Sequence, residues 1–393
     1  MLAVNFRAMG CQMQALCQPK DDSNSNIMAM ALADLSHQVG QAEQRFSRFL
    51  ADSELMQLNQ RRAMPVSGEF WQMLNHALAS AKLTDGIVSP TLLQPLYQKG
   101  YTQSFNQLSS HPVTKNTPLP SSVTTQPNTL SLTCDWRDIR LAPATQEVSL
   151  PKGLHLDLGG FAKGLTAWDC VKKLSANHYP ILFDAGGDIV TQGMTDPNGV
   201  AESTTATAWQ YWQVELPNIK DIGLPIEAIN SQKNLPSLDL TTMLSDWQMI
   251  DCPLLESVSV NLSYHNAFTL ATSGIDYRYW FQDGQLQHHL VHPYSQSGSD
   301  IVCASILIPH QHRFAHPAIQ QFLQVSNITN LAQTLSKLFC LLGVAQSRLW
   351  QQRYGLEGIG ISLLLLTQNT GKRVYQHWVN PALQSYIHLS EPI

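Results

Sequence analysis

Residues 154–193 read LHLDLGGFAKGLTAWDCVKKLSANHYPILFDAGGDIVTQG, and apolar residues change their spacing twice within them. Leucines alternate with polar residues over 154–158, which is typical of a short strand. After Gly159-Gly160, apolar residues recur every three or four positions over 161–174, which predicts a helix. A second apolar strand then runs into the Ala185-Gly-Gly-Asp188 turn. The segment therefore predicts strand, glycine turn, helix and strand in succession.

This order of elements is typical of an anion site. Glycines let the backbone approach a ligand closely, and the first amides of a helix point toward an anion. Lys163 adds a positive charge in the first turn of the predicted helix. The glycine spacing matches neither the three-glycine dinucleotide fingerprint nor the P-loop, and a tight turn explains a glycine pair equally well.

The composition of the 393-residue chain excludes several classes of protein. The net charge is −5 and only 13% of residues are charged, so no basic surface for nucleic acid is expected. The seven cysteines include no C-x-x-C pair, which favours reduced thiols over disulfides or a zinc site. The first residues, MLAVNFRAMG, lack the features of a signal peptide, and no apolar run is long enough for a transmembrane segment. We therefore expect a cytoplasmic location.

The remaining pattern predicts one α+β domain, residues 1–393, in which helices and strands mix without a regular βαβ order. Three polar regions, about 102–131, 194–208 and 220–251, are interpreted as insertions. The strands at 256–262, 267–272 and 301–308 are expected in one sheet. Further predicted elements are a hairpin over 3–18, helices at 26–46, from 53, 68–83, 315–322, 330–342 and 346–354, and strands at 209–216, 359–366 and around 375.

Three polar clusters are candidates for chemistry, and each has a plainer explanation. Thr272-Ser273-Gly274 follows a strand and is also a common turn. Three histidines occur in the five residues His288–His292, yet no acid or cysteine lies beside them at metal-ligand spacing, so one buried histidine explains them as well. Lys337 lies on a predicted helix, where a lysine is ordinarily a solvated charge.

Taken together, nine motifs occur in an order that resembles the ApbE family, the FAD:protein FMN transferases. They cover most of the chain outside the polar insertions. In chain order the motifs are MGC (Met9–Cys11), FSRF to SELMQLN (Phe46–Asn59), DGIVSPTLLQPL (Asp85–Leu96), LDLGGFAKG (Leu156–Gly164), AGGD (Ala185–Asp188), WQVELP (Trp212–Pro217), ATSGIDYR (Ala271–Arg278), HLVHP (His289–Pro293) and LSKLFCLLG (Leu335–Gly343).

The resemblance implies a single ApbE-like, T-fold-like domain with mixed sheets and packed helices. It implies that FAD is the substrate, that the FAD pyrophosphate is cleaved with release of AMP, and that FMN is attached by a phosphodiester to a Ser or Thr of a target protein. The usual target is a flavin-carrying subunit of a membrane electron-transport complex. Some members of the family instead hydrolyse FAD to FMN and AMP.

Roles carried over from the family fall on motif positions of this chain. His289 takes the place of the general base, which suits an imidazole because its pKa lies near working pH. The Gly160 carbonyl would face Mg²⁺, the metal expected for the family. The residues implied to contact FAD are Met9, Phe49, Ile87, Val88, Ser89, Asp157, Lys163, Leu290 and Val291.

The chain departs from the family where the metal ligands should lie. The late helix carries Gln333, Ser336 and Lys337 at positions where an Asp, a polar residue and a Thr are usual. A lysine cation repels a divalent ion, and Mg²⁺ prefers hard oxygen ligands. Three alternatives follow: a working transferase or FAD pyrophosphatase in which Lys337 replaces part of the metal charge, a catalytically degenerate FAD-binding relative, or a protein that no longer binds FAD.

Overall fold

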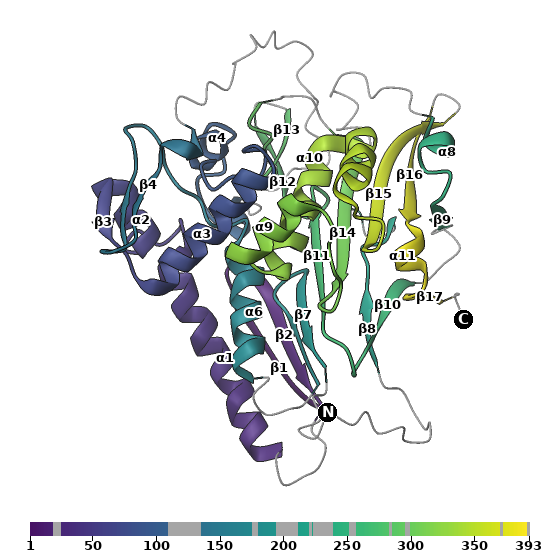
Figure 1. Cartoon of the computed structure of the whole chain (residues 1–393), viewed down its shortest axis with the longest axis horizontal. Coiled ribbons are helices and arrows are strands. Elements are labelled where there is room, and N and C mark those ends of the chain that lie inside the picture. Colours follow the sequence, from purple (N-terminus) through teal and green to yellow (C-terminus); the bar gives the residue numbers. More distant parts are fainter. Residues whose placement is uncertain are drawn as a thin grey trace.

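A nine-stranded antiparallel sheet forms the centre of the molecule (Figure 1). The computed structural model describes residues 1–18, 25–108, 135–174, 180–193, 211–219, 222, 239–250, 257–282, 285–294, 299–369 and 372–390. Across the sheet the strands are β1 (Leu2–Ala8), β2 (Cys11–Cys17), β6 (Ile181–Asp184), β7 (Asp188–Gln192), β11 (Phe268–Gly274), β14 (Ile301–Pro309), β15 (Gly360–Asn369), β16 (Lys372–Val379) and β9 (Gln248–Ile250).

The predicted N-terminal hairpin is confirmed. Strands β1 and β2 pair from Leu2 opposite Cys17 to Ala8 opposite Cys11. The turn consists of Met9 and Gly10, which have φ angles of 50° and 71°. A positive φ is uncommon for methionine, so this turn is held by its surroundings.

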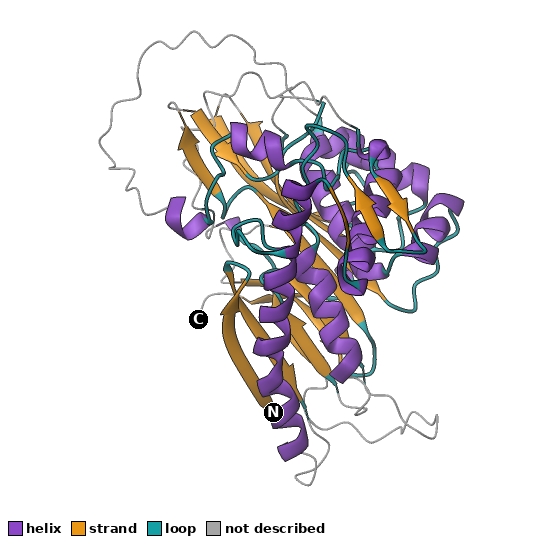
Figure 2. Cartoon of the chain, turned by 90° about the vertical axis from the view of Figure 1, so that its left-hand side faces the viewer, coloured by secondary structure: helices purple, strands orange, loops and turns teal. Residues whose placement is uncertain are grey.

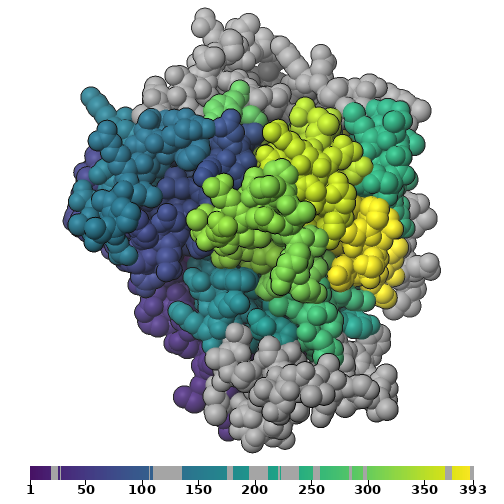
Figure 3. Space-filling model, in the orientation of Figure 1, coloured from purple at the N-terminus to yellow at the C-terminus, as the bar shows by residue number. Residues whose placement is uncertain are grey.

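Helices cover one face of the sheet (Figure 2). The helices α1 (Ser25–Phe46), α6 (Ala162–Leu174) and α10 (Ile328–Tyr354) pack on the strands, α9 (Pro317–Val325) and α3 (Gly68–Leu83) pack on α10, and α2 (Glu54–Arg61) lies beside α1. The helices predicted at 26–46 and 68–83 are confirmed. Apolar side chains of α10, including Leu331 and Leu335, pack in one core with Ala304 and Ile306 of β14. Burial of this apolar face holds the helical layer on the sheet. Figure 3 shows α9, in green, and α10, in yellow-green, packed against α3, in dark blue.

A small second sheet covers the opposite face. It consists of β17 (Ile387–Ser390), β10 (Ser257–Ser263) and β8 (Tyr211–Glu215). The prediction that 256–262 lies in the same sheet as 267–272 and 301–308 is wrong. The apolar side of β10 packs face to face on the large sheet, in one core with Leu270 and Leu307. Apolar alternation marks a strand with one buried side but does not say what covers that side.

The expected strand over 154–158 is absent. The leucines of this segment are buried, but its backbone bonds to side chains and loops. Asn59 Oδ1 accepts from the Leu156 amide at 2.7 Å, and Asn59 Nδ2 donates to the Leu156 carbonyl at 2.9 Å. The Asp157 amide donates to the Pro90 carbonyl at 2.7 Å. One buried amide side chain thus replaces a neighbouring strand.

The two helices predicted at 330–342 and 346–354 are confirmed as the two halves of α10, which is interrupted by non-helical backbone at Gly343. Gly343 has φ 77° and ψ 174°, and the Val344 amide donates to Asp300 Oδ1 at 3.0 Å. A Cβ at Gly343 would lie 2.5 Å from that same oxygen, so glycine is required there. A further short helix, α4 (Leu93–Gln98), tolerates Pro95 because the proline lies in its first turn.

The remaining described elements surround this frame. They are β3 (Ala63–Pro65), β5 (Glu147–Ser149) and β4 (Arg140–Ala142) in one sheet, the hairpin β12 (Tyr279–Gln282) and β13 (Gln285–His288), the helices α5 (Phe105–Leu108), α8 (Leu240–Met243) and α11 (Pro381–Gln384), and the 3₁₀ turn η2 (Trp136–Asp138).

The single-domain boundaries and the three insertions stay predictions. Residues 109–131, 194–208 and most of 220–251 lie outside the described part of the chain. Within the third region, 239–250 contain α8 and β9, and β9 pairs with β16. Among the described residues, α10 alone is long and apolar enough to cross a membrane, and 78% of its most apolar window is buried inside the fold. Burial of this extent is typical of a core helix.

Candidate functional site

The glycine turn before α6 is closed by its own hydrogen bonds. Asp157 Oδ1 accepts from the Gly159 amide at 2.8 Å. The amides of Phe161 and Ala162 both donate to the Leu158 carbonyl, at 2.9 and 3.0 Å. Three amides of this segment are therefore occupied by the turn, as the tight-turn alternative expects, and an anion site at this turn stays a prediction.

The second glycine turn, between β6 and β7, meets the side chain of Lys163. Lys163 Nζ donates to the Gly186 carbonyl at 3.1 Å. Gly186 and Gly187 have φ angles of 72° and 92°. A Cβ at Gly186 would lie 2.6 Å from Cys11 Sγ, so the turn and the β1–β2 hairpin are in close contact. Only glycine combines this conformation with this approach.

Asp188 at the start of β7 is the central acid of the site. Its side chain is buried, Gln333 Nε2 donates to Oδ2 at 2.9 Å, and Lys163 Nζ lies 3.7 Å from the same oxygen. A buried carboxylate needs such partners, because desolvation of an unpaired charge is costly. Asp188 therefore orients both Lys163 and Gln333.

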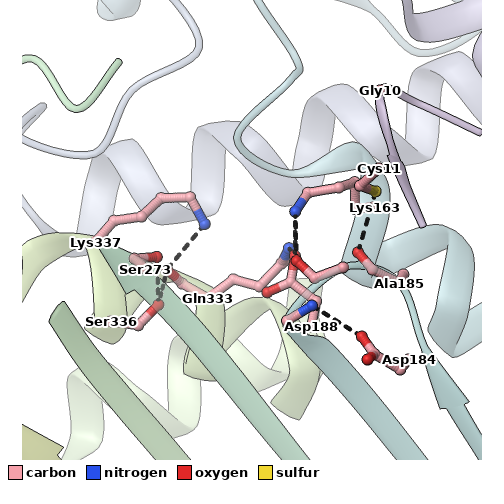
Figure 4. Close-up of polar contacts among 12 residues, drawn as sticks. Gly10, Cys11, Lys163, Asp184, Ala185, Asp188, Ser273, Gln333, Ser336 and Lys337 are labelled. Carbon is pink, nitrogen blue, oxygen red and sulfur yellow. Dashed lines mark hydrogen bonds and ion pairs between the residues drawn. The ribbon is translucent and has the colours of Figure 1, made fainter. Parts of the chain in front are cut away.

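Lys337 approaches the same place from α10 (Figure 4). Its Nζ donates to the Gln333 carbonyl at 3.2 Å, and its Cε lies 3.4 Å from the Cβ position of Gly160. Burial lowers the pKa of Lys337 to about 8, while the charge of Asp188 acts in the opposite direction and that of Lys163 adds to the lowering. In Figure 4 the two lysine side chains extend toward one another. We call Gly160, Lys163, Asp188, Gln333 and Lys337 the lysine corner.

The lysine corner does not fit Mg²⁺. Gln333 Nε2 is held by Asp188, so Gln333 can offer a metal only the single neutral oxygen Oε1, which is buried without a partner among the described residues. Ser336 Oγ is bonded to Ser273 Oγ at 2.8 Å, and within the described chain no three His, Cys, Asp or Glu side chains are grouped to hold a metal. An octahedral Mg²⁺ would have to share this space with the Lys337 ammonium.

His289 lies directly after β13, beside the β1–β2 turn. Its Nδ1 is 3.5 Å from the Arg278 carbonyl, and Arg278 Nη2 donates to the Gly10 carbonyl at 3.5 Å. Burial lowers the pKa of His289 well below 6.5, with further lowering by the charges of Arg278, His288 and Lys163. The imidazole is therefore neutral at neutral pH. If Nδ1 carries the proton toward the Arg278 carbonyl, Nε2 presents the lone pair that a base requires.

An aromatic group occupies another side of the site. The Arg48 guanidinium carbon lies 4.5 Å from the centre of the Phe49 ring, 5.9 Å from that of Tyr97 and 4.1 Å from that of Tyr101. The Tyr101 and Trp280 rings are 4.9 Å apart. We call Arg48, Phe49, Tyr97, Tyr101 and Trp280 the aromatic group.

This group is tied to the glycine turn, because Arg48 Nε lies 3.9 Å from Asp157 Oδ2. Of its rings, that of Phe49 is the most open, and Phe49 is 41% exposed. Val291 packs in one cluster with Tyr101 and Trp280.

The other predicted contact residues lie deeper or at the turn. Ile87 is half-buried, whereas Val88, Ser89 and Leu290 are buried. The Ser89 hydroxyl is paired with Thr91 Oγ1 at 2.8 Å, so its hydrogen bond stays within the loop. Met9 is half-buried and packs between two apolar cores. The structure thus places Lys337 against Gly160 and Gln333 and joins Lys163 to Gln333 through Asp188, whereas the side chains of Ser336 and Ser89 bond elsewhere.

Three residues of the site received no role from the sequence. Arg48, Asp188 and Arg278 all lie inside the recognised motifs FSRF, AGGD and ATSGIDYR. Only 13% of the residues are charged, so a charged residue in an otherwise small or apolar motif is a usable signal. Their partners, however, come from distant segments and are visible only in the fold.

Comparison with known proteins agrees with this architecture. The fold matches the ApbE protein of Thermotoga maritima (17% identity, TM-score 0.59, 99% of this chain and 97% of that chain covered). It also matches the flavin transferase ApbE of Vibrio cholerae (14%, 0.60, 98% and 98%) and the flavinyl transferase ApbE of Pseudomonas stutzeri (14%, 0.60, 98% and 96%). Among curated proteins, no sequence matches the chain. The sequence profile of the ApbE family matches residues 9–358, and the chain therefore belongs to the ApbE family.

Proposed function

We propose that this protein is an FAD:protein FMN transferase, which cleaves the FAD pyrophosphate and attaches FMN to a Ser or Thr hydroxyl of a target protein. The observation that carries the proposal is the lysine corner, where the Lys163 ammonium meets the Gly186 turn and the buried Asp188, and the Lys337 side chain lies against the Gly160 turn. Phosphoryl transfer depends mainly on positioning and on positive charge around the phosphate oxygens. Membership of the ApbE family supports the same reaction.

Two regions divide the recognition of FAD between them. Each lysine ammonium has three donor hydrogens, so Lys163 and Lys337 keep donors for diphosphate oxygens beyond their bonds to backbone carbonyls. The exposed face of Phe49 and the half-buried Met9 supply apolar contact for the flavin ring. Asp157 lies between the two regions, bonded to the glycine turn and close to Arg48.

The transfer step uses His289 as its base. The hydroxyl oxygen of the acceptor attacks the phosphorus of the FMN half, and its proton moves to His289 Nε2. The bond from that phosphorus to the bridging oxygen breaks, and AMP leaves with the bridging oxygen and its electron pair. The positive charges of Lys163 and Lys337 stabilise the negative charge that develops on the leaving phosphate.

The acceptor we propose is a flavin-carrying subunit of an electron-transport complex, and the proposed location is cytoplasmic. The support for this acceptor is the family resemblance.

The test uses purified protein, FAD and a flavin-acceptor domain, with the acceptor examined for in-gel flavin fluorescence and the solution for AMP. A fluorescent acceptor with an equal amount of AMP supports the transferase. AMP and free FMN without a fluorescent acceptor would indicate an FAD pyrophosphatase instead. Bound FAD without AMP would indicate a catalytically degenerate FAD-binding relative, and both of these results would overturn the proposed transfer.

A further inference from the structure

We propose that the Lys337 ammonium takes the place of the divalent cation in this protein, so that a diphosphate is held between Lys163 and Lys337 without Mg²⁺. The identification of that diphosphate as part of FAD rests on the proposed function. The inference concerns the kind of charge that binds the ligand, and it can be measured separately from turnover.

The position of Lys337 is the first support. The Gly160 carbonyl is where the family resemblance places the metal, and the Lys337 side chain lies against Gly160, with Cε 3.4 Å from the Cβ position. Its Nζ is anchored to the Gln333 carbonyl one helical turn earlier. The fold thus holds the Lys337 ammonium beside the position that a metal cation would occupy.

The second support is that Gln333 and Asp188 are already paired with protein groups. The Gln333 side-chain amide donates to Asp188 Oδ2 at 2.9 Å, and Lys163 pairs with the same oxygen at 3.7 Å. The acid that could attract a metal is therefore already neutralised by protein groups. A Cβ at Gly164 would lie 2.6 Å from Gln333 Cδ, so α6 and α10 are too close here for Gln333 to move freely.

The third support is the balance of charge. Lys163 and Lys337 carry two positive charges and Asp188 one negative charge, so the corner has a net charge of about +1 before any ligand binds. A diphosphate brings two negative charges and is attracted. Within the corner, a divalent cation would meet two ammonium groups and one carboxylate, so the corner's own charges favour the diphosphate over the cation.

The test measures binding by isothermal titration calorimetry with two probes, FAD and inorganic pyrophosphate, each in EDTA and in millimolar Mg²⁺. For the wild-type protein we expect dissociation constants for FAD that agree within about twofold in the two buffers. Lys337→Met should weaken binding of both probes by about tenfold or more, because one of two diphosphate-binding charges is lost. Lys172→Met is the matched control, since it removes a lysine charge from the far end of α6, where Lys172 lies over Trp168.

A second variant tests the replacement directly. Lys337→Thr combined with Gln333→Asp restores the oxygen ligands usual for the family, and FAD binding by this double variant should become at least about fivefold tighter in Mg²⁺ than in EDTA. Thermal melts of each variant show whether it is folded. If Lys337→Met does not fold, the double variant and the wild-type comparison still decide the question.

Two results would overturn the inference: FAD binding by the wild-type protein that tightens about tenfold in Mg²⁺, or a folded Lys337→Met protein that binds both probes normally. These outcomes differ from failure of the proposed function. A protein that releases no AMP but binds FAD without metal and through Lys337 supports the inference and refutes the transferase. If only pyrophosphate binds, the anion site stands and FAD recognition does not.

Discussion

The lysine corner and the aromatic group each contain positively charged side chains that are largely buried. The partners of those charges differ between the two regions. In the lysine corner, Lys163 and Lys337 each bond to one backbone carbonyl and keep further donors. In the aromatic group, Arg48 is buried under rings, and its Nη1 has no hydrogen-bond partner among the described residues. The comparison teaches that the first region is suited to binding a charged ligand, whereas the second uses its charge to hold aromatic rings in place.

The largest effect is expected at His289, the proposed base. His289→Ala should lower the rate of AMP release by at least about 100-fold, which is the lower end of what a general base contributes. The dissociation constant of FAD should change by less than about tenfold, or ~1.4 kcal/mol, because neither charge nor ring contact is lost. Single-turnover AMP release and calorimetry measure the two quantities. His289→Gln is the control for packing, and full activity in either folded variant would place the base elsewhere.

Removing the charge of the aromatic group should reduce stability. Arg48→Ala should lower the free energy of unfolding by about 2–3 kcal/mol, because three ring contacts are lost and Asp157 loses its cation. Arg45→Ala is the matched control at the end of α1. Its ion pair with Glu69 is exposed, so we expect about 0.5 kcal/mol or less. Urea unfolding of both variants decides the matter, and equal losses would refute the structural role of Arg48.

The glycine turn beside Lys163 should be nearly as sensitive. Gly186→Ala places a Cβ at positive φ and 2.6 Å from Cys11 Sγ, and should cost about 2 kcal/mol of unfolding free energy. Gly40→Ala in α1 has open space around its Cβ and should stabilise the protein by about 0.5–1 kcal/mol. Chemical denaturation of the two variants measures both the sign and the size of the change in unfolding free energy. A neutral Gly186→Ala would show that the turn can relax.

A smaller effect on ligand affinity should distinguish contacts made by the aromatic group from contacts made by the lysine corner. Phe49→Ala should weaken FAD binding by about fivefold, ~1 kcal/mol, through loss of flavin contact. Binding of inorganic pyrophosphate should not change, because the lysine corner is untouched. Quenching of flavin fluorescence and calorimetry give the two affinities. Weakening of both ligands alike would mean that the two regions are not independent.

The smallest change is expected on moderate acidification. An unperturbed histidine with pKa 6.5 would lose about tenfold of its neutral form between pH 7.5 and 5.5. Burial lowers the pKa of His289 well below 6.5, so the neutral form persists and is lost only as the pH falls through that lowered value. AMP release at saturating FAD should therefore fall by less than about threefold over this range. A tenfold fall would show that His289 titrates normally.

The spacing of apolar and turn residues predicted those helices and strands that depend on short stretches of sequence. Helices α1 and α3 and the β1–β2 hairpin follow from apolar periodicity and turn residues, and the structure confirms them. The strand expected over 154–158 failed because Asn59, nearly a hundred positions away, supplies its hydrogen bonds. The break between the two predicted C-terminal helices is confirmed at Gly343, where the Val344 amide donates to Asp300. The failure at 154–158 arises from a partner that is distant in sequence.

The candidate site divides in the same way. The sequence alone identified Lys163, His289 and Lys337 as candidates and showed that position 333 carries no acid. It could do so because the chemistry of a side chain depends only on the residue itself. Only the tertiary structure decided that Lys337 lies against Gly160, that Gln333 is bound by Asp188, and that Arg48 is enclosed by rings. These contacts join segments far apart along the chain, and their geometry is set by the packing of α6 and α10 on the sheet.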